Sequence, residues 1–301
     1  MRTGVIRNPR SHGNRGAPAA PSEPGLLFAE PLSPGALAAD LARFVAEGVE
    51  LLVIDGGDGT VREVLSALPA AFGEAPLLSV IPSGKTNILA FDLGVRRSWT
   101  LADARAAAGK VKPKVRVRAP LQVNRDGQPP LQGFVFGAAG LVRATALAAG
   151  VHRAGVFQNA SVGLTLAGAV AQFAAENARG AWRRGAPLTL TVDDGPARSG
   201  PRLITMATTL HRLPFALRPF GPARPGLKYL DVQAPPQRLA QALPALLWTR
   251  RDRWLERHGY RRGDAASLRL TLDSPFVLDG EVYPGGDLTV TEAPPLRFLT
   301  P

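Results

Sequence analysis

Residues 51–68, LLVIDGGDGTVREVLSAL, combine a strand pattern, a glycine turn and the start of a helix. The first four residues are all apolar, as expected of a strand in a parallel sheet that is covered on both faces. Apolar residues then recur at helical spacing from Val61 to Leu68. In the turn at 56–60, glycines permit positive φ and the close approach of a ligand. Unpaired amides at the start of a helix attract anions, so this stretch predicts a phosphate site.

The same alternation of strand and helix patterns runs through the first part of the chain. Strand patterns occur at 4–7 and 77–81, and helix patterns occur at 34–47 and 98–109. Strands that alternate with helices are typical of a parallel sheet with helices on both faces. We therefore expect residues 1–110 to form an α/β domain.

From residue 111 onward the patterns are mainly those of strands. Residues 111–118 alternate apolar and basic side chains, which is typical of a half-exposed strand. Helix patterns interrupt the strands at 158–178 and 237–257. We therefore expect residues 111–301 to form a second, β-rich domain. Its further strand patterns lie at 131–137, 187–193, 202–208, 227–232, 267–273, 275–279 and 287–291.

The composition excludes some kinds of site and leaves others open. The chain has 301 residues and no cysteine, which excludes disulfides, thiolate metal sites and cysteine nucleophiles. Its formal net charge of +12 is compatible with nucleic acid, an anionic membrane surface or a polyphosphate as partner. No apolar run reaches the roughly 18 residues of a membrane span, and no signal-peptide pattern precedes the first strand. We therefore expect a cytoplasmic protein that is soluble or peripherally bound to a membrane.

Asp58 lies inside the glycine turn, where its carboxylate would repel a phosphate. This position predicts that Asp58 holds a cation or handles a proton. The alternative is a tight strand-to-helix turn in which Asp58 caps the helix. A second glycine segment, residues 84–86, resembles the end of a Walker P-loop, but that loop needs a glycine where this chain has Ser79. We therefore reject the Walker interpretation.

Four segments, in the same order along the chain, carry a resemblance to a known family. They are Asn8-Pro9-Arg10-Ser11-His12-Gly13, Gly56 to Thr60 followed by Glu63, Ile81 to Asn87, and Leu278-Asp279-Gly280-Glu281. The chain resembles the diacylglycerol kinase, sphingosine kinase and ceramide kinase family, including its bacterial lipid kinases. The resemblance implies an α/β ATP-binding domain at 1–110 and a lipid-binding β-sandwich domain at 111–301. It also implies that ATP, together with Mg²⁺, phosphorylates the primary hydroxyl of a membrane lipid.

The resemblance further implies roles for individual residues. The catalytic carboxylates are expected to be Glu281, Asp279 and Asp58, with Glu281 favoured as the general base. Alternating positions would place Asp279 and Glu281 on the same face of an extended strand. No protein ligands are assigned to Mg²⁺. The residues expected to bind the nucleotide are Asn8, Pro9, Arg10, Ser11, Gly56, Gly57, Asp58, Gly59, Thr60, Glu63, Gly84, Lys85, Thr86 and Asn87.

Three positions depart from the family's pattern. Lys85 replaces a threonine, Ile88 replaces an aspartate, and Pro225 replaces the aspartate of a structural metal site, which we do not carry over. These departures motivate an alternative, a degenerate kinase that binds lipid or nucleotide as a regulator. A soluble kinase of the NAD kinase type is a weaker alternative, because its Asn-Glu motif is absent. Among acceptors the departures favour ceramide over diacylglycerol, and sphingoid bases stay open.

Residues 248–262, WTRRDRWLERHGYRR, interleave arginines with tryptophan and tyrosine. Aromatic side chains favour the headgroup level of a bilayer, and basic residues are attracted to anionic lipid. We expect this segment to dock on the inner face of the membrane. The alternative is an ordinary helix packed by Leu247, Trp248 and Leu255 with a solvated basic face. No nucleic-acid-binding motif is present, so nucleic acid is not expected as a partner.

Overall fold

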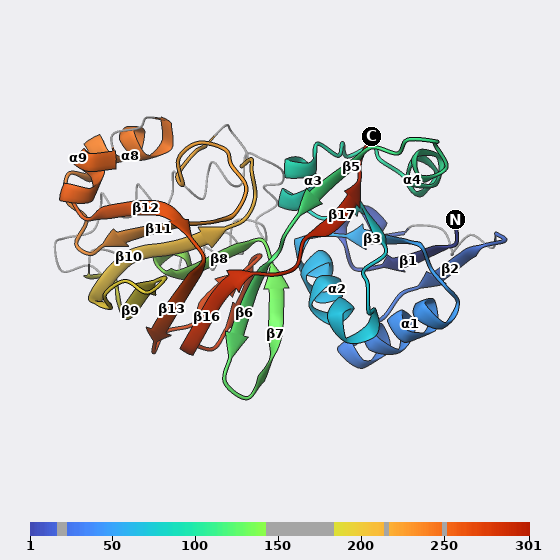
Figure 1. The fold of residues 1–301 in the computed structure, drawn as a ribbon, viewed down its shortest axis with the longest axis horizontal. Coiled ribbons are helices and arrows are strands. Elements are labelled where there is room, and N and C mark those ends of the chain that lie inside the picture. Colours follow the sequence, from blue (N-terminus) through green and yellow to red (C-terminus); the bar gives the residue numbers. More distant parts are fainter. Residues whose placement is uncertain (17–22, 143–183, 214–216, 249–251) are drawn as a thin grey trace. The chain divides into compact units, whose positions relative to one another are not determined.

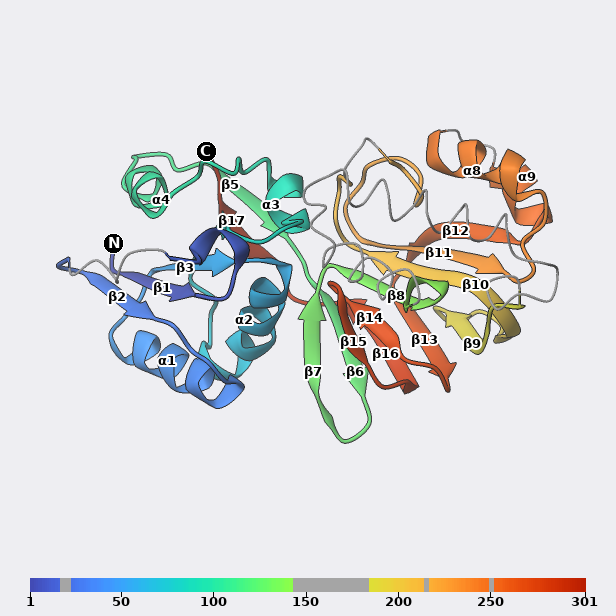
Figure 2. The same ribbon diagram turned by 180° about the vertical axis from the view of Figure 1, so that it is seen from behind.

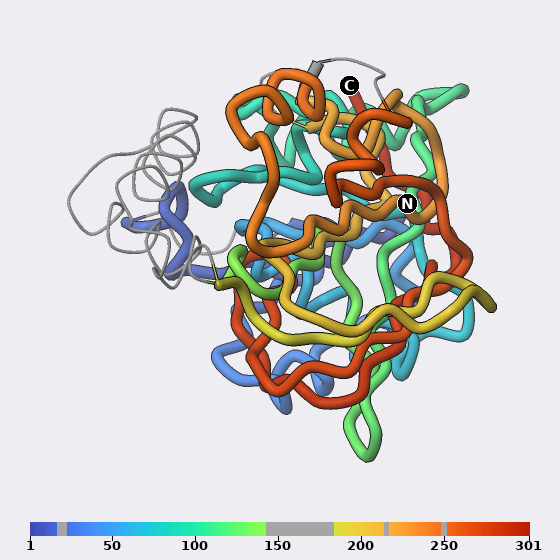
Figure 3. The backbone as a smooth tube through the Cα atoms, turned by 90° about the vertical axis from the view of Figure 1, so that its left-hand side faces the viewer, coloured from blue at the N-terminus to red at the C-terminus, as the bar shows by residue number. Residues whose placement is uncertain are grey.

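The computed structural model describes residues 1–16, 23–142, 184–213, 217–248 and 252–301, and the other ranges are grey in Figure 3. The chain divides into two compact units, each of which is described by itself. Unit 1 comprises Met1–Pro120 and Pro294–Pro301, and unit 2 comprises Leu121–Ala293. The helix expected at 158–178 lies outside the described residues.

Unit 1 is built on a six-stranded sheet. Its strands are β1 (Thr3–Arg7), β2 (Leu26–Ala29), β3 (Leu51–Gly56), β4 (Leu77–Pro82), β5 (Val115–Arg118) and β17 (Leu296–Leu299). They lie in the order β2-β1-β3-β4-β17-β5. The first five of these strands are parallel, and β5 is antiparallel to β17. The apolar run at the start of β3 is fully buried at the centre of this sheet, as its composition predicts.

Helices cover both faces of the unit 1 sheet (Figure 1). They are α1 (Pro34–Ala46), α2 (Asp58–Ala71), α3 (Ile88–Leu93) and α4 (Leu101–Ala108), and a short 3-10 helix spans His12–Asn14. The start of α1 is the one that the sequence predicts. Ser33 Oγ accepts a hydrogen bond from the Ala36 amide at 3.2 Å, and Pro34 occupies the first turn. The α/β class expected for this part of the chain is therefore confirmed.

The strand order of unit 1 reverses between β1 and β3. From β1 the chain continues to β2 on one side, whereas from β3 it continues to β4 on the other side. In open α/β sheets, ligands bind beyond the carboxyl ends of the strands at such a reversal. Arg7 of β1 pairs with Asp55 of β3 in the sheet register. Asn8 and the glycine turn therefore begin side by side at this edge.

Unit 2 is dominated by an antiparallel sheet of eleven strands. Side chains from one face of its strands, including Leu121, Phe136, Leu190 and Leu270, form a single buried cluster. Its two described helices are α8 (Leu239–Trp248) and α9 (Asp252–Arg257), which lie within the helical range expected at 237–257, and residues 249–251 of that range lie outside the described residues. The β-rich class expected for the second domain is confirmed. The strands are β6 (Leu121–Arg125), β7 (Gln128–Gly133), β8 (Val135–Ala139), β9 (Ala186–Val192), β10 (Arg198–Thr208), β11 (Leu227–Gln233), β12 (Tyr260–Ala265), β13 (Ser267–Leu272), β14 (Phe276–Leu278), β15 (Glu281–Tyr283) and β16 (Gly286–Glu292).

The division between the units differs from the expected change at residue 111. β5 and the C-terminal β17 belong to the unit 1 sheet, so the chain returns to unit 1 after completing unit 2. The alternation at 111–118 predicts a strand but not the sheet that it joins. Arg118 of β5 forms an ion pair with Asp92 of α3, and both side chains are buried. Such a long-range pair attaches β5 to the first unit.

Asp279 and Gly280 form the turn of the hairpin between β14 and β15 (Figure 2). Their φ angles are 47° and 86°, which is the type I′ geometry that an Asp-Gly pair favours. The Asp279 carboxylate accepts hydrogen bonds from the Phe134 amide at 3.0 Å and the Val135 amide at 2.8 Å. The expectation that Asp279 and Glu281 share one face of a strand is therefore wrong, because Asp279 belongs to the turn.

The Asp279 contacts predict a role in stability. Asp279→Ala leaves two amides without their acceptor, so we expect the free energy of unfolding to fall by about 1–3 kcal/mol. Asp279→Asn keeps one acceptor oxygen and should cost less. Glu281→Gln, at an exposed position two residues away, is the control and should leave stability unchanged. Urea unfolding measures all three, and an Asp279→Ala variant as stable as the control would contradict this account.

Candidate active site

The two glycine segments of unit 1 touch through their backbones. Gly57 caps the start of α2, and Gly84 lies directly against it. A Cβ atom added at Gly84 would overlap the Cα of Gly57, and one added at Gly57 would lie 3.1 Å from the Cα of Gly84. Only glycine fits both positions without a backbone shift. The structure thus brings together residues 56–60 and 83–87, which the sequence places 27 positions apart.

The loop after β1 joins the same edge of the sheet. Asn8 Nδ2 donates a hydrogen bond to Thr60 Oγ1 at 2.9 Å, and the Asn8 amide donates to the Asp55 carbonyl at 2.9 Å. Asn8 Oδ1 in turn accepts a hydrogen bond from the Arg10 amide at 2.9 Å. Asn8 therefore connects the first predicted loop to the start of α2, and three predicted segments converge on one place.

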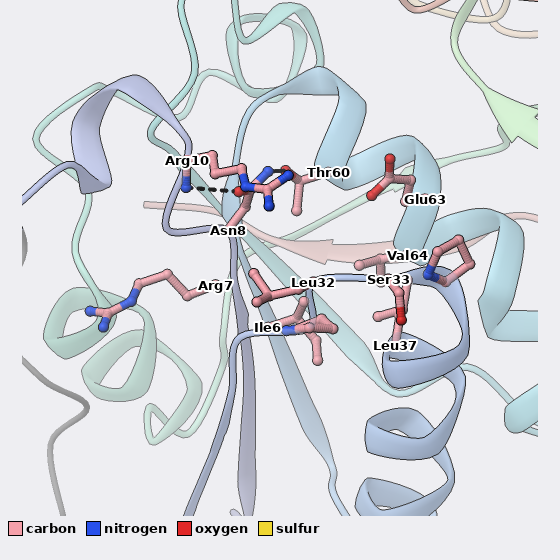
Figure 4. A pocket seen from close by; sticks show the side chains of 12 residues that line it. Ile6, Arg7, Asn8, Arg10, Leu32, Ser33, Leu37, Thr60, Glu63 and Val64 are labelled. Carbon is pink, nitrogen blue, oxygen red and sulfur yellow. Dashed lines mark hydrogen bonds between the residues drawn. The ribbon is translucent and has the colours of Figure 1, made fainter.

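A cavity of about 190 Å³ opens beside Asn8 and Thr60 (Figure 4). Four of the residues expected to bind nucleotide line it, namely Asn8, Arg10, Thr60 and Glu63. The remaining lining is largely apolar and comes from β1, α1, α2 and the segment before α1. Drug-sized ligand sites usually occupy about 300–1,000 Å³, so this cavity suits a part of a nucleotide. The other lining residues are Ile6, Arg7, Pro31, Leu32, Ser33, Pro34, Leu37 and Val64.

Asp58 caps a helix, although not the helix that it begins. Its Oδ1 accepts a hydrogen bond from the Ile88 amide at 2.7 Å, at the start of α3. Burial raises the pKa of the Asp58 carboxyl, and the backbone amides around Ile88 offset part of that effect. The carboxylate therefore links the first glycine segment to the residues that follow the second one.

Asn87 closes the second glycine segment with its side chain. Its Oδ1 accepts from the Gly84 amide at 2.9 Å, and its Nδ2 donates to the carbonyls of Pro82 and Gly84 at 3.1 and 2.7 Å. Asn87 itself has a φ of 55°, a left-handed conformation that asparagine tolerates better than most residues. Lys85 lies within this closed loop, and its carbonyl accepts a hydrogen bond from Arg97. The asparagine thus shapes the loop that presents Lys85 and Thr86.

Two expected site residues lie in unit 2. Asp279 is engaged by the amides of β8, as described above. Glu281 is exposed, and no hydrogen bond or ion pair within the described residues involves its carboxylate. The Asp279 carboxylate therefore stabilises the fold through hydrogen bonds, whereas the exposed Glu281 carboxylate can contact a ligand.

Sequence reasoning missed three polar residues beside the glycine segments: Asn14, Asp55 and Ser83. Asn14 is buried, and Asp55 and Ser83 are partly buried. Of these three residues, Asp55 could have been found from the sequence, because it is an acidic residue directly after the apolar run of β3. No group of three or more histidine or acidic side chains among the described residues could hold a metal.

The loop that contains Pro225 is held by a lysine. Lys228 is buried, and its Nζ donates hydrogen bonds to the carbonyls of Arg224 and Gly226 at 2.9 and 2.7 Å. These carbonyls thus already face a cation that belongs to the chain.

Residues 4–117 match the family model of the diacylglycerol kinase catalytic domain. This segment, which is about two fifths of the chain, is therefore similar to the diacylglycerol kinase catalytic domain. The matched region contains the whole convergence described above, from Asn8 to Asn87. It ends inside β5, so the family model does not extend to unit 2.

Curated relatives and solved structures agree with the family match. Over 75 residues the chain is 39% identical to "Probable lipid kinase YegS" of Shigella flexneri, covering 23% of this chain and 25% of that protein. Over 76 residues it is 36% identical to "Probable lipid kinase YegS-like" of Enterobacter sp. (strain 638), covering 24% and 25%. The matches thus span about a quarter of the length of these relatives.

A diacylglycerol kinase structure from Bacillus anthracis str. Sterne has a TM-score of 0.62 at 16% identity, covering 100% of this chain and 97% of that one. Another structure from the same strain has a TM-score of 0.67 at 19% identity, covering 100% and 96%. At this identity the similarity establishes the shared two-part fold. Among the described helices, none is both long and apolar enough to span a bilayer.

The buried Asp58 carboxyl predicts a pH-dependent difference in stability. Because its pKa is raised, the folded protein holds this proton at pH values where the unfolded chain has released it. Ionisation of Asp58 therefore costs stability as the pH rises above the ordinary aspartate pKa of about 3.9. Asp58→Asn keeps an acceptor for the Ile88 amide and removes the ionisable group. Its stability relative to the wild type should increase as the pH rises above about 4, measured by urea unfolding. A difference that stays constant or falls with pH would contradict the assignment.

Proposed function

We propose that the protein is an ATP-dependent lipid kinase that phosphorylates the primary hydroxyl of a membrane lipid. The observation that carries this proposal is the backbone contact between Gly57 and Gly84 at the strand-order reversal of unit 1. Two glycine segments and a helix start at such an edge suit the phosphates of a nucleotide. The family match and the lipid kinases among the relatives support a lipid as acceptor.

The donor nucleotide is assigned to unit 1. The amides in the first turn of α2 would bind the phosphates, which the lack of side chains at Gly57 and Gly84 would let approach closely. Asn8 and Thr60 line the adjoining cavity and would bind the next part of the nucleotide. Lys85 would bring a positive charge toward the β- or γ-phosphate. Mg²⁺, when bound with the nucleotide, neutralises charge on the phosphates.

The acceptor hydroxyl needs a base, which we assign to Glu281 of unit 2. Its carboxylate is exposed, whereas those of Asp58 and Asp279 accept hydrogen bonds from backbone amides. Both of these carboxylates already satisfy backbone amides, so an acceptor hydroxyl would have to compete with those hydrogen bonds. Asp58 and Asp279 thus have mainly positioning roles in this proposal. Unit 2 would also bind the lipid, for which ceramide, a sphingoid base and diacylglycerol are the candidate classes.

A kinase assay with Glu281→Gln tests the base. Loss of a general base typically costs about 10²–10⁴-fold in rate, so we expect kcat to fall at least 100-fold with unchanged thermal stability. The assay follows radiolabelled ATP into a chloroform-soluble product with ceramide, sphingosine and diacylglycerol side by side, and we expect ceramide to be labelled best. Near-normal turnover by Glu281→Gln would refute the assigned base.

The alternative function is a regulator that binds nucleotide or lipid without turnover. It is motivated by Lys85 and Ile88, which stand where the family has threonine and aspartate. In the same assay a regulator would bind ATP but label no lipid with any acceptor. A kinase of the NAD kinase type would instead label a water-soluble product.

We propose that the basic segment 248–262 contacts anionic membrane lipid, with one correction to its expected chemistry. Tyr260 is buried, its hydroxyl donates to the Gln237 carbonyl at 2.8 Å, and burial raises its pKa to about 12. Leu255 is also buried, so Tyr260 and Leu255 serve the core of unit 2 rather than the bilayer. Among the described residues of this segment, Arg253 and Arg257 are the exposed arginines and would make the contact, and residues 249–251 lie outside the described residues.

Two variants with the same change in net charge test this contact. Arg253→Gln/Arg257→Gln removes two charges from α9, and Lys110→Gln/Lys112→Gln removes two exposed charges from unit 1. At about 1 kcal/mol per basic residue, the α9 variant should lose roughly 30-fold in binding to phosphatidylserine vesicles. The lysine variant should lose much less. Equal losses in a sedimentation assay would mean that net charge, rather than this segment, drives binding.

A further inference from the structure

Asp55 places a carboxylate at the end of β3, immediately before the glycine turn. Its Oδ1 accepts hydrogen bonds from Ser83 Oγ and, at 3.1 Å, from Asn14 Nδ2. Ser83 directly precedes the second glycine of the site, and Asn14 belongs to the loop after β1. One side chain therefore connects all three segments that converge at the candidate site.

Ser83 is bonded through each of its polar groups. Its amide donates to the Gly56 carbonyl at 3.2 Å, and its carbonyl accepts from the Gly13 amide at 2.8 Å. Its hydroxyl donates to Asp55. The backbone bonds hold Ser83 between the first loop and the glycine turn, and the hydroxyl bond fixes it against the end of β3.

The position of Ser83 determines how Gly84 meets Gly57. These two glycines are already in backbone contact, so a small rotation at Ser83 would separate or overlap them. Asn14 provides the matching support on the other side. It is buried, and its Nδ2 also donates to the carbonyl of Asn8 at 3.0 Å, the residue whose side chain bonds Thr60.

We infer that Asp55 is a positioning residue of the proposed kinase site, which sets the spacing of the phosphate-binding segments through Ser83 and Asn14. The inference rests on the proposed function for the identity of the ligand. What Asp55 supplies is a fixed acceptor oxygen, and neither its charge nor a proton is required. Asparagine can replace it in this role, whereas alanine cannot.

The test compares four single variants and one double variant of the full chain. They are Asp55→Asn, Asp55→Ala, Ser83→Ala, the double variant Asp55→Ala/Ser83→Ala, and Glu74→Gln, an exposed carboxylate of unit 1 as charge-matched control. The first measurement is the Kd of ATP with Mg²⁺ by calorimetry, without lipid. The others are KM for ATP, kcat and the free energy of unfolding.

We expect Ser83→Ala to weaken ATP binding roughly tenfold, on the scale of one lost hydrogen bond. Asp55→Ala also loses the hydrogen bond from Asn14, so we expect it to weaken binding at least as much. The double variant should be no weaker than the worse single variant, because both remove the same bond. Asp55→Asn and the control should stay within about twofold of the wild type. The KM for ATP should rise in parallel with the Kd, with a smaller effect on kcat.

Three results would overturn the inference. Equal losses of ATP affinity in Asp55→Asn and Asp55→Ala would assign the role of Asp55 to its charge or to metal binding. The alanine variants could unfold more easily while binding ATP normally, which would make the contact merely structural. Additive losses in the double variant would show that Asp55 and Ser83 act separately.

Failure of the proposed function gives a different pattern. A wild type that binds ATP but labels no lipid refutes the kinase assignment, while the Kd comparison still decides the role of Asp55. A wild type that does not bind ATP refutes both. Should Asp55→Ala fail to fold, Ser83→Ala and Asp55→Asn decide the question alone.

Discussion

The contact between Gly57 and Gly84 is the constraint on which the rest of the site depends. Two backbone segments approach so closely that neither position has room for a Cβ atom. Strands β3 and β4 are parallel neighbours, so their carboxyl ends bring the two segments to the same edge of the sheet. The sheet therefore brings the two segments together. Because the two glycines carry no side chains, a phosphate could approach the start of α2 closely.

Carboxylate and amide side chains hold this arrangement rather than exposing charge to a ligand. Asp58 reaches across to the start of α3, and Asn87 closes the loop between Pro82 and Ile88. Asp58 therefore lies beside the proposed phosphate site because its carboxylate accepts a hydrogen bond from the backbone amide of Ile88. A buried, hydrogen-bonded carboxylate stabilises the loops because its acceptors satisfy amides that would otherwise lack partners. Glu281 is exposed and is therefore the carboxylate that we propose to act on a substrate.

Local patterns made much of unit 1 predictable. The apolar run of β3, the glycine turn and the periodic residues of α2 are contiguous, and Ser33 carries its own capping signal. The short elements β2 and α3 gave no such signal, because four to six residues are too few to show a period. The place of β5 in the first sheet depends on Arg118 and Asp92, which lie far apart in sequence.

The same limit applies to the site residues. Motif resemblance identified the segments at 8–11, 56–60 and 84–87, and the structure brings these three together. The resemblance did not identify Asp55 and Ser83 as site residues, because their role depends on a hydrogen bond between two segments and not on a pattern within one segment. In unit 2 the alternation rule misplaced Asp279, because a type I′ turn interrupts the extended geometry that the rule assumes. Tyr260 was assigned to the surface by its basic neighbours, whereas its ring fills the core beneath α8 and α9.

The central claim is that unit 1 binds nucleotide phosphates where the two glycine segments meet. Amide hydrogen exchange of the full chain, with and without a non-hydrolysable ATP analogue and Mg²⁺, tests this claim most directly. We predict that the analogue protects amides within 8–14, 56–60 and 83–88 and leaves the edge strand β2 unchanged. Saturating binding of the analogue with no protection in these three segments would contradict the account.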